Sequence, residues 1–171
     1  IMEFVKGKSL HDSAHGKAIN QKTAVEIISA VCSGLDHAHD SGILHRDIKP
    51  ANILLGKKAI PKIGDFGLAR VNGVTESGVI YGTPGYSAPE VLAAPDKVDN
   101  RTDIFAVGVM FYELLTGRMP ADRYVSVTEF VEADAKFDKI IQKAIHPNID
   151  MRYRSAQDFT DEIIDVIKNP S

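Results

Sequence analysis

Two short strings constrain this chain more than any other feature of its sequence. The first is H-R-D-I-K-P-A-N at residues 45–52, and the second is D-F-G, which begins at Asp65, eighteen residues after Asp47. At average residue usage, the six fixed residues of the pattern H-R-D-x-K-P-x-N are expected by chance in about one of 10⁵ to 10⁶ chains of this length. Both strings lie among short apolar pieces and turn residues, so the fold must hold two loops that carry several polar and charged side chains.

The polar residues of these strings suit phosphoryl transfer from ATP. Asp47 can orient an attacking hydroxyl and accept its proton, and Lys49 can neutralise charge on the transferred group. Asn52 and Asp65 can supply oxygen ligands to Mg²⁺. Any one of these residues alone is more simply interpreted as a solvated loop residue, whereas the set favours a catalytic site that uses ATP and Mg²⁺.

Composition excludes several classes of protein. The 171 residues, 44% of them hydrophobic, suffice for one domain with a buried core. A net charge of -3 gives no general attraction to nucleic acid, and the apolar stretches are too short or too interrupted to cross a bilayer. The single cysteine, Cys32, cannot form an internal disulfide, which favours a buried thiol in a cytoplasmic protein. Because the histidines lack metal-type spacing, His37 and His39 are interpreted as solvated or packed helix residues.

Hydrophobic periodicity predicts a mainly α fold with a few short β pieces. Helices are predicted at residues 23–39, 103–116, 137–145 and 156–167. Strand pieces are predicted at residues 42–45, 52–55 and 61–63, and residues 1–5 indicate the end of a buried strand that leads into a loop at 6–8. Residues 64–90, rich in glycine and proline, indicate a long surface segment.

With these motifs in order, the chain resembles the C-terminal large lobe of a eukaryotic-like, bacterial-type serine/threonine protein kinase domain. Residues 45–52 resemble the catalytic loop, D-F-G the magnesium loop, and A-P-E at 88–90 the end of the activation segment. The resemblance implies a partial kinase domain over residues 1–171, one lobe of an α+β two-lobed fold. Its expected parts are a hinge at 1–8, the catalytic loop at 45–52, an activation segment at 65–90 and a helical remainder at 91–171.

The resemblance also implies how adenine is held. The segment M-E-F-V at residues 2–5 is similar to the hinge between kinase lobes, with Met2 as the gatekeeper. The Glu3 carbonyl and the Val5 amide are then expected to bond the base edge, and Leu54 to pack beneath the ring.

Several further residues receive structural roles by the same resemblance. Glu90 is expected to pair with a late arginine, for which Arg152 is the better match and Arg154 the alternative. Asp103 resembles the aspartate that braces the catalytic loop, and its interpretation as a helix cap stays open.

One more structural contact is expected between the two loops. His45 is expected to pack against Phe66 of D-F-G, the string that Gly67 completes.

Specificity and regulation follow from the same comparison. Lys49 is the residue typical of serine/threonine kinases at this position, and Thr83 resembles the residue that contacts both Asp47 and Lys49. Arg46 is expected to receive a phosphate on Thr75 or Ser77, which are otherwise ordinary loop hydroxyls.

No glycine-rich loop and no strand lysine stand before Ile1 in this chain. We therefore expect a fragment of a longer kinase that transfers phosphate poorly by itself. Expected partners are protein substrates with serine or threonine and a second kinase that forms a dimer or phosphorylates this one in trans. The location expected is cytoplasmic, with any membrane anchor outside this segment. The alternative function is a non-catalytic, kinase-like interaction module.

Overall fold

The computed structural model describes residues 7–14, 16–56, 60–64, 70–71 and 83–171. Its α-helices are α1 (Leu10–Ala14), α2 (Gln21–Asp40), α3 (Glu90–Ala93), α4 (Asn100–Thr116), α5 (Lys136–Ala144) and α6 (Ala156–Lys168). Its strands are β1 (Lys8–Ser9), β2 (Ile43–Leu44), β3 (Ile53–Leu55), β4 (Pro61–Ile63) and β5 (Arg70–Val71). Short 3₁₀ helices lie at η1 (Pro50–Asn52), η4 (Pro95–Lys97), η5 (Val127–Glu129) and η6 (Ile149–Met151).

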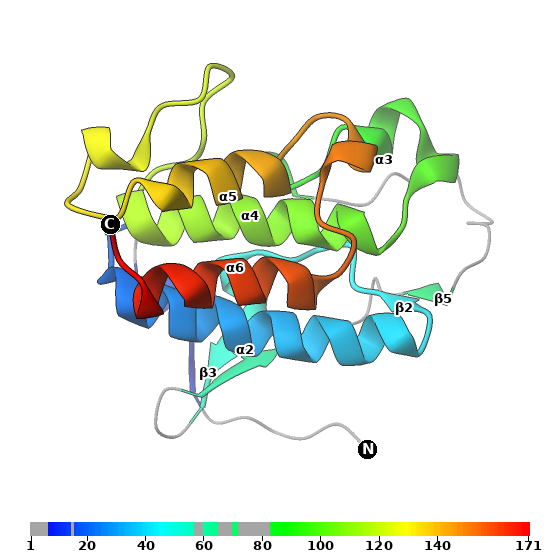
Figure 1. Cartoon of the computed structure of the whole chain (residues 1–171). Helices are drawn as coiled ribbons and strands as arrows, with labels where there is room; N and C mark the ends of the chain where they lie inside the picture. The colour runs from blue at the N-terminus through cyan, green and yellow to red at the C-terminus, as the bar shows by residue number, and fades with distance from the viewer. Residues whose placement is uncertain (1–6, 15, 57–59, 65–69, 72–82) are drawn as a thin grey trace.

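Helix α4 occupies the middle of the helical layer. Figure 1 shows α5 along one side of it and α2 with α6 along the other, while the strands lie beyond α2 and at its far end. The predicted mainly helical fold, with all four of the predicted helices, is confirmed.

Helix α4 begins earlier than its apolar pattern indicates. The side chain of Asp99 caps it by accepting the amide of Arg101, and Gly117 ends it with a left-handed φ of 72°. The helix-cap interpretation of Asp103 is therefore wrong, because Asp103 lies one turn inside the helix.

One continuous core joins these helices. Phe111 of α4 lies edge-on to Phe137 of α5 and to Phe159 of α6, with ring centroids 5.3 and 6.1 Å apart. All three rings are fully buried, and burying such a side chain contributes about 1.5–3 kcal/mol. Cys32 of α2 lies in the same core, where burial raises the pKa of its thiol to about 12, in agreement with the predicted buried thiol.

The strands form two small antiparallel sheets that frame the loops. One sheet has the order β1-β3-β4 and the other pairs β2 with β5. The prediction of a loop at residues 6–8 is wrong for Lys8. This residue belongs to strand β1, in which Lys8 pairs with Leu55 and Ser9 with Leu54. Helices α1 and α3 and strand β5 were not predicted, since each is too short to show a period. The strand expected at residues 1–5 lies outside the described residues.

Across the part of the chain that the structure describes, none of the helices combines the length and the apolar composition needed to cross a bilayer.

Two mid-helix glycines provide a matched test of this packing. A Cβ atom on Gly108 of α4 would lie 2.7 Å from the Cβ of Ala144 and 2.9 Å from Ile145, whereas one on Gly34 of α2 would meet only the flexible end of Ile63 at 3.1 Å. Both changes to alanine gain up to about 1 kcal/mol of helix propensity. We expect Gly108→Ala to lower the free energy of unfolding by about 1–2 kcal/mol, because overcrowding outweighs that gain. Gly34→Ala should be neutral or stabilising in the same urea denaturation experiment; equal effects would contradict this packing.

Candidate active site

The catalytic-loop segment runs from β2 to β3 and is held in place by Asp103 of α4. The Asp103 carboxylate accepts the backbone amides of His45 (2.9 Å) and Arg46 (2.8 Å). Arg46 has a φ of 68°, which is costly for a side chain of its size. The two bonds to Asp103 hold the backbone in this strained conformation. The bracing contact expected for Asp103 is thus present.

A third donor to Asp103 was missed by the sequence analysis. His39 of α2 donates its Nε2–H to the Asp103 carboxylate at 2.8 Å, and its side chain is only 7% exposed. The sequence predicts a packed or solvated helix histidine and contains no local signal that links positions 64 residues apart. His39 instead joins α2 to the brace, so that a buried carboxylate is satisfied by three N–H donors.

His45 couples the catalytic loop to the residue before D-F-G. Its ring nitrogen Nδ1 accepts the Asp47 amide at 3.2 Å, so the proton lies on Nε2, which donates to the Gly64 carbonyl at 2.9 Å. The Gly64 amide in turn donates to the Asn52 carbonyl at 2.7 Å. These bonds hold Gly64 against the catalytic loop. Phe66, the expected packing partner of His45, lies outside the described residues.

Asp47 and Asn52 converge as their spacing suggests. The side-chain amide of Asn52, nearly buried, donates both to the Asp47 backbone carbonyl (2.7 Å) and to Asp47 Oδ2 (3.1 Å). With the NH₂ group committed to Asp47, the carbonyl oxygen Oδ1 is the atom of this side chain that suits a hard cation. Asn52 therefore fits a magnesium ligand. No group of three or more His, Cys, Asp or Glu side chains that could hold a metal by itself occurs within the described ranges.

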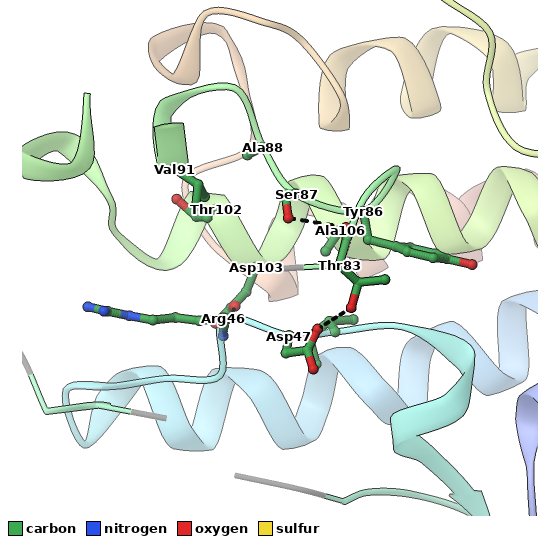
Figure 2. A pocket seen from close by; sticks show the side chains of 11 residues that line it. Arg46, Asp47, Thr83, Tyr86, Ser87, Ala88, Val91, Thr102, Asp103 and Ala106 are labelled. Atoms are coloured by element: carbon green, nitrogen blue, oxygen red, sulfur yellow. Dashed lines mark hydrogen bonds between the residues drawn. The ribbon is translucent and has the colours of Figure 1, made fainter. Parts of the chain in front are cut away.

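Thr83 bridges the two charged groups of the loop. Its hydroxyl donates to Asp47 Oδ1 at 2.7 Å and accepts from Lys49 Nζ at 2.7 Å, while Lys49 Nζ lies 3.5 Å from Asp47 Oδ2. Figure 2 shows Thr83 reaching down to Asp47, with the Arg46 side chain pointing away from both. One hydroxyl thus fixes a carboxylate and an ammonium group at a single point, the contact expected from the resemblance.

A buried ion pair anchors the segment that carries Thr83 at Glu90, the first residue of α3. Arg152 donates to both oxygens of Glu90 at 2.7 and 2.8 Å, and Thr102 also donates to Glu90 at 2.8 Å. Burial raises the pKa of Glu90, but hydrogen bonds from Arg152, the Glu90 amide and Thr102 outweigh it and hold the pKa below its ordinary value. The expected pair is present with Arg152; the alternative, Arg154, is exposed and its carbonyl accepts from Asn100 instead.

Of the remaining predicted site residues, Leu54 lies within the part of the chain that the structure describes. Leu54 lies half-buried in β3, opposite Lys62, and a Cβ on Gly64 would meet its side chain at 3.3 Å. Residues outside the described ranges are Met2, Glu3, Val5, Asp65, Phe66, Gly67, Thr75 and Ser77.

Known proteins resemble this chain over nearly all of its length. The family model described as protein kinase domain matches residues 1–170. Serine/threonine-protein kinase PknB of Mycobacterium tuberculosis is 35% identical over 187 aligned residues, which cover 97% of this chain and 30% of that protein. A probable PknB of Bifidobacterium longum is 34% identical, with 96% of this chain and 27% of that protein covered.

A solved structure agrees with the fold. The crystal structure of the Mycobacterium tuberculosis PknI kinase domain matches with a TM-score of 0.77 and 27% identity, over 96% of this chain and 64% of that chain. The chain spans about 30% of the length of the curated PknB proteins and about two thirds of the PknI kinase domain. The catalytic-loop geometry, the Glu90–Arg152 pair and the match over residues 1–170 agree: this chain belongs to the protein kinase family.

Proposed function

We propose that this chain supplies the catalytic large lobe of a serine/threonine protein kinase, which transfers the γ-phosphoryl group of ATP to serine or threonine hydroxyls of proteins. The observation that supports it most is the Thr83 hydroxyl held between Asp47 and Lys49. A module that only binds other proteins has no need for a carboxylate, an ammonium group and a carboxamide joined in this way. The names of the PknB relatives support the same activity.

In this proposal each residue of the loop has a defined role. Asp47 orients the substrate hydroxyl and accepts its proton, and its own position is fixed by bonds from Thr83 and Asn52. Lys49 stabilises negative charge that develops on the transferred group. The strained backbone at Arg46, held by Asp103, keeps the loop in one conformation, so little reorganisation is needed during the reaction.

ATP and Mg²⁺ belong to the proposal as cofactors. Asn52 and Asp65 would hold Mg²⁺, and the hinge residues Met2, Glu3 and Val5 with Leu54 would hold adenine. The bound metal would neutralise charge on the ATP phosphates.

Regulation and surroundings also stay predictions. A phosphate on Thr75 or Ser77 would pair with Arg46, whose side chain points away from Asp47 and leaves the reaction site free. We further propose protein substrates as partners, a second kinase copy acting as dimer or in trans, and a cytoplasmic location for this segment.

The test is an assay of the full-length protein with γ-labelled ATP and three peptides that differ only in a serine, threonine or tyrosine acceptor. We expect label on the serine and threonine peptides and none on the tyrosine peptide. Chelation of divalent ions with EDTA should abolish transfer and excess Mg²⁺ should restore it. Binding of the peptides without transfer of label would instead favour the non-catalytic interaction module, and equal labelling of tyrosine would contradict the assigned specificity.

A further inference from the structure

The turn at residues 83–87 determines where the Thr83 hydroxyl lies. Thr83 is held at its side chain by Asp47 and Lys49, and at its backbone carbonyl by the turn that follows it. Gly85 makes this turn possible, because its φ of 90° is unfavourable for residues with a Cβ. A change in the conformation of the turn would therefore move the Thr83 hydroxyl that bridges Asp47 and Lys49.

Ser87 is the residue of this turn that bonds Thr83 with both its backbone and its side chain. The Thr83 carbonyl accepts the amides of Tyr86 (3.1 Å) and Ser87 (3.2 Å), and it also accepts the Ser87 hydroxyl at 3.2 Å. Figure 2 shows Ser87 and Thr83 on the same turn, above Asp47 and beside the small pocket that these residues line.

The turn has a second anchor, at the side chain of Tyr86, that does not involve Thr83. The Tyr86 hydroxyl donates to the Glu113 carboxylate of α4, which ties the turn to the central helix. Rotation of the Thr83 peptide relative to this anchor is opposed by the bonds to its carbonyl, and Ser87 contributes two of the three. Loss of the Ser87 hydroxyl would leave the turn folded and the Thr83 peptide less constrained.

We propose that Ser87 is a positioning residue for phosphate transfer, which acts by holding Thr83 so that its hydroxyl bridges Asp47 and Lys49. This inference rests on the proposed kinase function. Because the hydroxyl bond is long for an O–H donor, its expected effect is moderate: a two- to five-fold fall in the rate of transfer when it is removed.

The experiment measures kcat and KM of the full-length protein on a serine peptide. Ser87→Ala should lower kcat two- to five-fold and leave the KM for ATP and for peptide unchanged, whereas Ser87→Thr keeps the hydroxyl and should restore kcat. Ser41→Ala is the matched control, because the Ser41 hydroxyl makes the same kind of bond, to the His37 carbonyl four residues earlier, far along the chain from Thr83. It should leave kcat unchanged.

Coupling to Thr83 separates positioning from a general structural role. In a Thr83→Val background, which lacks the bridging hydroxyl, Ser87→Ala should cause no further loss of kcat. Losses that multiply in the double variant, an unchanged kcat in Ser87→Ala, or a change in peptide KM alone would each overturn the inference while leaving the kinase function intact. A folded wild-type protein that transfers no phosphate would overturn the kinase function itself and this inference with it.

Discussion

Replacing Arg152 by alanine is expected to lower the free energy of unfolding by about 3–5 kcal/mol, because it leaves the Glu90 carboxylate buried without its cation. The Arg152 side chain is fully buried and donates to both Glu90 oxygens and to the His146 carbonyl. Its guanidinium also lies 4.8 Å from the centroid of the Phe105 ring. Truncation removes all of these contacts together. Arg152→Lys should recover only part of the loss, since an ammonium group cannot reproduce the two parallel bonds.

Arg101, also an arginine in an ion pair, provides the control for this prediction. It pairs with Asp99 at 2.8 Å and with Asp150 at 3.0 Å, but Asp150 is 76% exposed and Arg101 itself 24%. Exposed pairs contribute about 0–1 kcal/mol, so Arg101→Ala should have a small effect in the same urea denaturation series. A similar loss for the two arginines would contradict the structural importance of the Glu90–Arg152 pair.

The pH dependence of stability should report the same pair. The pKa of Glu90 is lowered in the folded protein, so its contribution is complete above the ordinary glutamate pKa of about 4.3 and is lost as the pH falls through the lower, folded value. The wild-type protein should therefore lose stability over this acidic range. In Arg152→Ala the loss of stability over this pH range should be smaller than in the wild type. The same dependence of the free energy of unfolding on acidic pH in both proteins would argue against a contribution from the Glu90–Arg152 pair.

The sequence predicts best what is local. Apolar residues that recur at helical spacing predict the long helices, and the structure has helices at these places: α2, α4, α5 and α6. Helices α1 and α3 could not be predicted, because four or five residues are too few to show a period and such helices are stabilised by tertiary contacts.

The site required more than periodicity. Asp47 and Asn52 come together because they share one tight loop, whereas the contact of Thr83 with Asp47 spans 36 residues and was expected only from the family resemblance. The choice between Arg152 and Arg154 depended on burial, which no pattern in D-M-R-Y-R determines. His39 and Ser87 were missed for a related reason: their hydrogen bonds depend on the packing of α2 and on the conformation of the turn after Thr83.

Removing the negative charge of Asp47 is expected to lower the rate of phosphate transfer by about 10²–10⁴-fold, the usual contribution of a positioned general base. Asn keeps the size of Asp, and its carbonyl oxygen can still accept the Thr83 hydroxyl that now bonds Asp47 Oδ1 at 2.7 Å. The 3.1 Å bond from Asn52 to Oδ2 is lost, because an NH₂ group cannot accept it, but Asn52 keeps its 2.7 Å bond to the backbone carbonyl of residue 47. The loop should therefore keep its conformation while losing the group that accepts the substrate proton. ATP affinity should change little, because in this account Asp47 acts on the attacking hydroxyl.

Asp161→Asn provides the control for the change in charge, since Asp161 lies exposed on α6, outside the catalytic loop. Its rate should equal that of the wild-type protein. Equal thermal unfolding midpoints for Asp47→Asn, Asp161→Asn and the wild type would exclude misfolding as the cause of a lost rate.

The proposed kinase function is tested most directly by a single-turnover measurement of label transfer from γ-labelled ATP to a serine peptide, with full-length wild-type protein and its Asp47→Asn variant. We expect transfer by the wild type and a rate at least about 100-fold lower in the variant, with both proteins binding ATP equally. Equal rates in the two proteins would show that Asp47 is not the catalytic carboxylate and would contradict the proposed mechanism.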